Sequence, residues 1–353
     1  MKDEGFSYFI LNPFPYSAKV KEKGEYMKRR LFIAVLLIML LQSLACQDIL
    51  GMPGDNAAAF MKIGSGARAI GLGSAFAAAA DDVSASYWNP AGLAQIEGPA
   101  IAVVDRTPVM DTDYACAAIA APVWKIGFIG ISGIYYGCGE VPMYAENGLS
   151  NGTLNDREAA IILSYAYKIN QLSIGANVKY IYQDMSADIS AVSDGIGGDV
   201  SILYRMFDNL AVGAILHNKY KIADKDNDDI SSESPVNISA GIHYRLNMGK
   251  DNSLNFMLDF DQTKSYPLKL HFGTELILVD FFYLRTGLDD IYAETKGANI
   301  AHLDLIRQNL KPAFGLGLKW RMGSNNQRAL IFDYAISIEK LGLRNFFTLG
   351  YQF

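Results

Sequence analysis

The sequence predicts an all-β protein, a transmembrane antiparallel β-barrel of about fourteen strands with a helical hatch of small residues in its lumen. Three observations predict it. From about residue 100 onward, segments of about ten residues repeat in which apolar and polar side chains alternate. Short connections between these segments alternate with longer polar ones. The chain also ends inside such a segment, on the aromatic residue Phe353.

Composition excludes several other classes of protein. The chain has 353 residues, of which 50% are hydrophobic and only 19% are charged, so it is not disordered. Its net charge of −6 and its lack of a basic stripe exclude a nucleic-acid partner. The longest apolar run, residues 31–41, has about half of the ~20 residues that a spanning helix needs. A helical membrane protein is therefore excluded as well.

That apolar run has the flanks of a signal peptide. Lys28, Arg29 and Arg30 precede it, and the small-residue triplet at 43–45 follows it as a cleavage site. We therefore expect translation to start at Met27 and residues 27–45 to be the signal peptide. Residues 1–26 show no periodic pattern and are interpreted as an upstream extension with no part in the fold.

Cysteine usage gives one candidate modification. Cys46 follows the cleavage site directly, so it is either a lipidation site or the first residue after plain cleavage. The chain has 3 cysteines and no CxxC spacing, which argues against a zinc site. We expect no metal and no cofactor.

Residues 46–99 are predicted to be the hatch, because they are rich in Ala and Gly and poor in strand formers. A short helix is expected within residues 67–80, broken by Gly71 and Gly73. Asn89 followed by Pro90 is a helix-start signal, with Asn as the cap and Pro at the first helical position.

Arg68 is the charge of the hatch that most needs a partner. A cation inside a barrel is costly unless it is paired. One interpretation is a latch, in which Arg68 pairs with Asp81, with Asp82 or with an acidic residue of the lumen wall. The alternative is an ordinary arginine solvated in a water-filled plug.

Residues 100–353 are predicted to form the barrel. In one segment Ile174, Ala176, Val178 and Tyr180 alternate with Ser173, Gly175, Asn177 and Lys179. Successive side chains of a strand point to opposite faces, so each strand has one apolar face and one polar or small face. We expect strands near residues 100–106, 113–122, 124–136, 156–168, 170–185, 194–206, 209–219, 234–247, 252–261, 266–279, 281–289, 310–321, 326–338 and 343–353.

The connections predict how the barrel sits in the membrane. Residues 121–124, 168–171 and 206–209 are short turns, whereas residues 137–156 and 288–311 are long and polar. Short periplasmic turns alternating with long external loops are typical of the bacterial outer membrane, with both termini periplasmic. Outer-membrane lipid is then the first partner of the chain.

The last strand carries a candidate assembly signal. Four apolar or aromatic residues lie on one face of it and end at the C-terminus: Phe347, Leu349, Tyr351 and Phe353. Outer-membrane barrels commonly end in this way, and their assembly machinery reads that strand.

The most specific motif runs from Ile63 through the block at residues 64–73 to the segment at residues 88–94. Its G-x-R-A-x-G-x-G pattern, the Ala-rich run and the Trp-Asn-Pro-Ala-Gly segment resemble the N-terminal region of the PorV/PorQ family, a branch of the FadL-like outer-membrane barrels. The resemblance implies a barrel with an N-terminal hatch. It also implies a role without bond chemistry, either in type IX secretion or in moving hydrophobic molecules. The protein is therefore not expected to be an enzyme.

The same resemblance leaves two features open. The hatch residues Asn89, Pro90, Ala91 and Gly92 either gate a ligand path or form a capped turn that is needed only for folding. Three glycines spaced by three, Gly127, Gly130 and Gly133, either open a lateral gap in the wall or mark tight packing against the hatch.

Between the two roles, the sequence favours a protein-binding component of a type IX-like secretion or surface-attachment system. The alternative is a FadL-like channel for hydrophobic small molecules. Apolar residues in the two longest predicted loops indicate a partner surface. These candidate residues are Val141, Met143, Tyr144, Ile291, Tyr292, Ile300 and Leu305.

Overall fold

The computed structural model describes residues 58–109, 112–144, 147–186, 190–217, 220–224, 231–263, 266–293, 310–323, 328–339 and 342–353. The predicted upstream extension, the signal peptide and Cys46 lie outside these residues, as do Ile300 and Leu305. No helix in the described part of the chain is long and apolar enough to cross a membrane.

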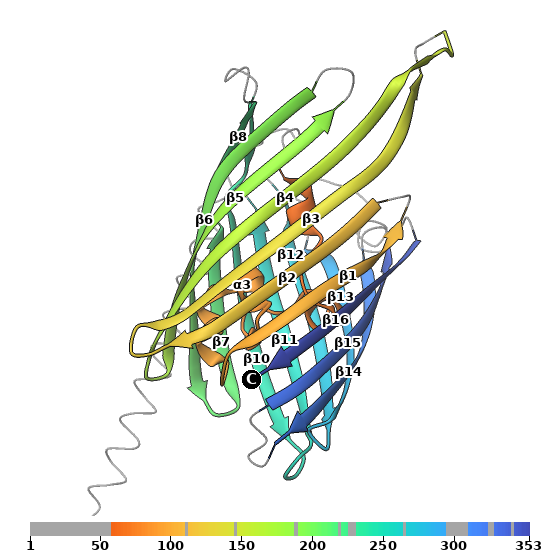
Figure 1. The fold of residues 1–353 in the computed structure, drawn as a ribbon. Helices are drawn as coiled ribbons and strands as arrows, with labels where there is room; N and C mark the ends of the chain where they lie inside the picture. The colour runs from red at the N-terminus through yellow and green to blue at the C-terminus, as the bar shows by residue number, and fades with distance from the viewer. Residues whose placement is uncertain are drawn as a thin grey trace, which may run out of the picture. The chain divides into compact units, whose positions relative to one another are not determined.

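A closed antiparallel barrel of fourteen strands surrounds the lumen (Figure 1). The strands begin with β1 (Ala100–Val109), β2 (Thr112–Val123), β3 (Gly127–Tyr144), β4 (Ser150–Ile169), β5 (Leu172–Ser186), β6 (Ser190–Phe207), β7 (Leu210–His217), β8 (Tyr220–Asp224) and β9 (Ser231–Ser234). They continue with β10 (Asn237–Asn247), β11 (Ser253–Thr263), β12 (Leu268–Leu278), β13 (Phe282–Ala293), β14 (Lys311–Met322), β15 (Arg328–Glu339) and β16 (Gly342–Gln352). Because β8 continues β7 along β6, and β9 continues β10, these sixteen segments make fourteen barrel strands.

The barrel closes where its first strand meets its last. Ala100 of β1 pairs with Gln352 of β16 on one side and with Ala120 of β2 on the other. The N–H of Phe353 also donates to the carbonyl of Pro99 at 2.9 Å. We call this end of the barrel, with its short turns such as residues 124–126 and 170–171, the turn end, and the opposite end the loop end.

Along each strand, side chains point alternately to the outer face and to the lumen, as predicted. On β5, Val178 is 58% exposed on the outer face, whereas Asn177 is 3% exposed in the lumen. An apolar outer face suits lipid, and a closed ladder leaves no strand edge without partners in the hydrocarbon. The fold class expected from the sequence is therefore confirmed.

The predicted loop 137–156 is wrong in its extent. β3 continues to Tyr144 and β4 begins at Ser150, so most of this segment is strand. β3 and β4 have 18 and 20 residues, whereas β16 has 11. The polar composition of residues 137–156 hid the strands because both faces of a strand beyond the membrane can meet water. Residues 288–293, predicted as loop, likewise belong to β13.

The hatch is a chain of short helices inside the barrel. They are η1 (Ala59–Lys62), α2 (Ala67–Gly71), α3 (Ala85–Trp88) and η2 (Pro90–Gln95). The predicted helix within residues 67–80 is only the five residues of α2, because Gly73, at φ 62°, leaves the helical conformation. The predicted start at Asn89 is confirmed, since its side chain accepts a hydrogen bond from the N–H of Ala91 and Pro90 occupies the first position.

Candidate functional site

Glycines of the barrel wall seat the hatch against it. A Cβ at Gly273 would lie 2.5 Å from the carbonyl oxygen of Leu72, and one at Gly71 would lie 3.0 Å from the Cα of Gly315. Side chains at Gly175 and Gly213 would collide with the hatch backbone at residues 90–91 and 77–78. These contacts run from β5 round to β14. The wall glycines therefore let the hatch backbone lie directly on the sheet over that sector.

Arg68 lies at the centre of a buried charge network, which we call the latch. Its Nε and Nη2 donate to the carboxylate of Glu275 at 3.1 and 3.3 Å, and its Nη1 reaches Asp82 at 3.2 Å. Nη1 also pairs with Asp81. Of the two interpretations left open by the sequence, a paired arginine and a solvated one, these contacts agree with the paired arginine. The function of this network as a latch stays a prediction.

The latch continues across the barrel wall. Glu275 of β12 accepts from Nε of Arg285 at 2.8 Å, and Nη1 of Arg285 lies 2.5 Å from Asp333 of β15. Charges of opposite sign thus alternate from the hatch through three strands. Sequence analysis did not name these three wall residues. The signal was present, because each is a charge at a lumen-facing position in the middle of a strand.

This pairing shifts the pKa values of Arg68 and Asp81. Burial alone would lower the pKa of Arg68, but the carboxylates of Asp81, Glu275 and Asp82 outweigh it and hold that pKa well above its usual value. Burial would raise the pKa of Asp81, yet the charge and hydrogen bond of Arg68 lower it overall. Both groups are therefore charged at neutral pH.

A second seat of the hatch lies at Asn89. Its Nδ2 donates to the carbonyls of Ala77 at 2.6 Å and Ile202 at 3.3 Å, and Asn89 is fully buried. The N–H of Ala91 also donates to Oγ of Ser201 at 3.0 Å. Pro90 and Gly92 are buried beside them. This network organises the turn and fixes it to β6, which fits the capped-turn interpretation, while a gating role stays a prediction.

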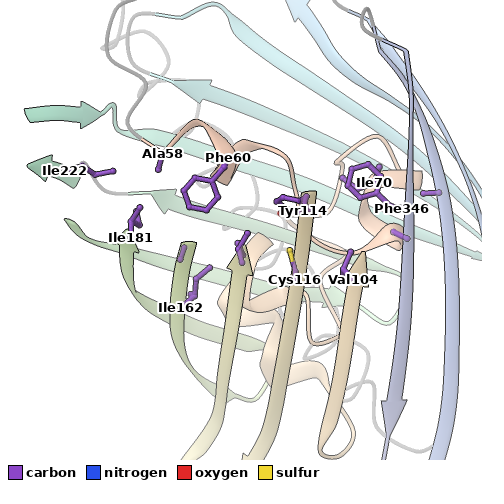
Figure 2. Packing of buried hydrophobic residues seen from close by; sticks show 14 residues of the cluster. Ala58, Phe60, Ile70, Val104, Tyr114, Cys116, Ile162, Ile181, Ile222 and Phe346 are labelled. Atoms are coloured by element: carbon purple, nitrogen blue, oxygen red, sulfur yellow. The ribbon is translucent and has the colours of Figure 1, made fainter. Parts of the chain in front are cut away.

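An apolar cluster occupies the loop-end half of the lumen (Figure 2). Phe60 of η1 lies among side chains from neighbouring wall strands and is only 3% exposed. We call this set the loop-end cluster. Its larger members are Phe60, Ile70, Val104, Tyr114, Ile134, Ile162, Ile181, Ile222 and Phe346. This half of the lumen therefore holds an apolar cluster with a few buried polar residues beside it, such as Arg106 and Glu158, whereas most of the wall around the latch is polar.

A cavity of about 660 Å³ lies at the turn end of the lumen, and we call it the vestibule. One side of it is charged and includes Arg68, Lys319 and Arg321. Its other side follows β1, β2 and β16 and consists mainly of small or apolar residues, with Gln352 as a polar one. Residues that line this second side include Ala100, Ala102, Val104, Cys116, Ala118, Thr348 and Gly350.

The remaining predicted residues lie on the wall. Met143 and Tyr144 belong to β3, and Ile291 and Tyr292 to β13, so these four are strand residues instead of loop residues. Val141 is also in β3. The stripe of Phe347, Leu349, Tyr351 and Phe353 lies on the outer face at β16 and its end. Nothing in this geometry tests their roles in partner binding or assembly.

The predicted three-residue spacing of glycines in β3 does not open the wall. Gly130 packs against Leu93 of the hatch, whereas a Cβ at Gly133 would meet no other atom within 4 Å. β3 pairs without interruption from Gly127 to Cys138 with β2, and from Phe128 to Cys138 with β4. Gly130 therefore agrees with the packing interpretation.

Comparisons with known proteins agree with the fold. Residues 50–203 match an uncharacterised protein family, UPF0164. The chain is similar in structure to the CymD monoaromatic hydrocarbon channel, with a TM-score of 0.54 and 13% sequence identity over 82% of this chain and 96% of that one. It is similar to the toluene transporter TbuX of Ralstonia pickettii, with a TM-score of 0.53 and 14% identity over 82% and 98%.

The toluene transporter TodX of Pseudomonas putida gives a TM-score of 0.53 and 12% identity, over 82% of this chain and 99% of that one. No curated protein sequence matches the chain. At these identities the likeness shows the fold alone, an outer-membrane-type barrel. It agrees with the outer-membrane-type barrel that the sequence predicts.

Proposed function

We propose that this protein is an outer-membrane channel for hydrophobic small molecules, with both termini in the periplasm. The observation that carries the proposal is the loop-end cluster. Lumens of water-filled barrels are polar, whereas here Val104, Ile134, Ile162 and Ile181 face the lumen and are buried. A hydrophobic molecule entering from the loop end would therefore meet an apolar surface.

Phe60 marks the place that such a molecule would take. Its ring belongs to the hatch, and the residues around it belong mainly to the wall. Burying an apolar side chain of this size contributes about 1.5–3 kcal/mol. A guest with a ring of similar size would recover a comparable amount when it displaces Phe60, so exchange between the two is close to balanced. This balance suits passage better than tight retention.

The comparisons support the same function. The three solved structures of similar fold are named as a monoaromatic hydrocarbon channel and as toluene transporters. A compound of that class, one aromatic ring with few polar atoms, matches the apolar side chains of the loop-end cluster in chemistry. We therefore take monoaromatic hydrocarbons as the first substrates to test.

A matched pair of substitutions tests the channel. Ile162 is fully buried in the lumen, and its neighbour Ile161 is 53% exposed on the outer face. We expect Ile162→Thr to slow the uptake of radiolabelled toluene into cells and Ile161→Thr to leave it unchanged, with folded barrel measured by heat-modifiable migration in both. Uptake by the wild type that does not exceed that of cells with an empty vector would refute the function.

A protein-binding role is the second candidate, and the long β3–β4 hairpin favours it. Tyr144, near the tip of that hairpin, is 68% exposed. In this reading the chain is a PorV/PorQ-like component of a type IX-like secretion or surface-attachment system, and the hairpin contacts a secretion protein. Replacing Met143 and Tyr144 by serine should then reduce surface display of secreted proteins without changing toluene uptake.

A further inference from the structure

We infer that permeating molecules cross the hatch along the inner face of β1, β2 and β16, and that residues 64–66 form the gate on this route. The inference rests on the proposed channel function. It begins with the shape of the vestibule, which follows these three strands from the turn end as far as Val104, Cys116 and Thr348. We call these three residues the upper row.

Two residues of the upper row, Val104 and Cys116, already belong to the loop-end cluster. Val104 pairs with Cys116 of β2 and with Thr348 of β16. In the next lumen-facing positions Arg106 pairs with Tyr114 and with Phe346, and these two aromatic residues belong to the cluster. Successive residues on one face of a strand are about 7 Å apart. The cavity open to the turn end thus reaches the near edge of the loop-end cluster, and Tyr114 and Phe346 lie about one such step further on.

The lining along this route suits a hydrophobic molecule. Ala100, Ala102, Ala118 and Gly350 line the wall side of the vestibule. Their small side chains leave room beside the sheet, and they present carbon to the lumen. The charged wall residues of the vestibule belong to other strands, and one of them, Asp333 of β15, pairs with Thr348 across the β15–β16 ladder. A molecule with few polar atoms can therefore follow the small and apolar side chains of β1, β2 and β16 past the hatch.

Other sectors of the hatch leave less room. From β5 to β14 the hatch backbone lies against wall glycines, so close that a single Cβ at Gly175, Gly213 or Gly287 would collide with it. The wall itself is hydrogen-bonded continuously on both sides of β3 from residue 128 to residue 138. The β1, β2 and β16 sector is therefore where a void already separates hatch and wall.

Residues 64–66 close this sector through three hydrogen bonds. Tyr114 donates from its hydroxyl to the carbonyl of Gly64 at 2.6 Å, and Trp88 donates from Nε1 to the carbonyl of Ser65 at 2.6 Å. The N–H of Ala67 donates to Oγ of Thr348 at 2.8 Å. The first two hold residues 64 and 65 through side chains, so the segment can be released without breaking a strand ladder.

The backbone of the gate is built to turn. Gly64 and Gly66 have φ of 93° and 89°, a region that L residues with side chains rarely adopt. They flank Ser65, which lines the vestibule together with Cys116 of the upper row. Rotation about these two glycines would move Ser65 away from Cys116 and open the vestibule to the rest of the loop-end cluster, including Tyr114 and Phe346.

A reversible cross-link tests the gate. Ser65→Cys in a Cys46→Ser, Cys138→Ser background places a second thiol beside Cys116, and oxidation should join them, as peptide mass spectrometry would verify. We expect toluene uptake to fall to the level of cells with an empty vector and to return on reduction. A matched control adds Cys116→Ser to the same background, so that oxidation cannot bridge the gate and uptake should not change.

A second pair of variants keeps the test independent of disulfide formation. Ala118 faces the lumen beside the vestibule, whereas Ala117 is exposed on the outer face. Ala118→Phe should remove most of the uptake and Ala117→Phe should not. Full uptake by the cross-linked protein, or by folded Ala118→Phe, would overturn the route while leaving the channel function intact. No uptake by the unmodified protein would instead overturn both.

Discussion

Removing the charge of Arg68 should loosen the hatch without unfolding the barrel. Arg68→Met keeps a long side chain but leaves Asp81, Asp82 and Glu275 without their shared cation. Breaking a buried ion pair by removing one partner costs about 3–5 kcal/mol. Two facts favour the lower end of that range. Glu275 keeps Arg285 at 2.8 Å, and the side chains of Asp81 and Asp82 are each 31% exposed and can regain water.

About 3 kcal/mol corresponds to a roughly 100-fold change in the equilibrium between docked and released hatch. Hydrogen–deuterium exchange in detergent measures that equilibrium. The N–H of Ala67, bonded to Thr348, and the N–H of Ala77, bonded to Asp259 at 2.7 Å, are the reporters. Both should exchange roughly 100-fold faster in Arg68→Met than in the wild type, while strand amides of β4 and β5 keep their protection.

Two further variants separate charge from geometry. Arg68→Lys keeps the charge but replaces a planar guanidinium with several donors by a point charge, so an intermediate rate is expected. Arg328→Met alters an exposed arginine of β15 and should have no effect. If the hatch amides of Arg68→Met exchange at the wild-type rate, the charge network does not hold the hatch and the latch interpretation fails.

Three more predictions concern acid, the glycine contacts and assembly. Because Arg68 lowers the pKa of Asp81, this pair stabilises the docked hatch fully at pH values above the ordinary pKa of 3.8, and the stabilisation is lost as the pH falls through the lower pKa of the folded state. Protease protection of the hatch should therefore be constant near neutral pH and fall only in acid. A loss of protection near pH 6 would contradict this. Gly213→Val should loosen the hatch by about 1–3 kcal/mol through overpacking, whereas Gly133→Val, on the open outer side, should not, as limited proteolysis would report. Deleting Phe353 should reduce the amount of heat-modifiable barrel, and unchanged levels would mean that the last strand is not read as an assembly signal.

Most of the barrel could be predicted because its signal is local. A period of two between apolar and polar side chains depends only on neighbours in sequence, so β5 could be placed from residues such as Asn177 and Val178. The alternation of short turns with longer loops then indicated at which end of the barrel each connection lies. The strand ends at Tyr144 and Ser150 escaped prediction because lipid no longer imposes alternation beyond the membrane.

The site could be predicted only in part, since it depends on contacts between distant residues. Arg68 could be expected to need a partner from its charge and its small neighbours. Its bond to Glu275 joins residues 207 positions apart, and no local pattern indicates that distance. The apolar lumen around Ile162 was missed because β4 has apolar residues on both of its faces near this position. The local sequence therefore does not show which of these residues face the lumen.

The wall glycines have a consequence for how this protein tolerates change. At Gly175, Gly213 and Gly273 the added atom of an alanine would already strike the hatch. In a library that replaces every residue singly, such positions should accept nothing larger than hydrogen, while glycines such as Gly133 accept many side chains. Glycines such as Gly241 and Gly317 would also be restricted, but by Asp259 and Asp333 of the wall. Once these are set aside, the restricted positions on the unrolled sheet should follow the path of the hatch across the wall.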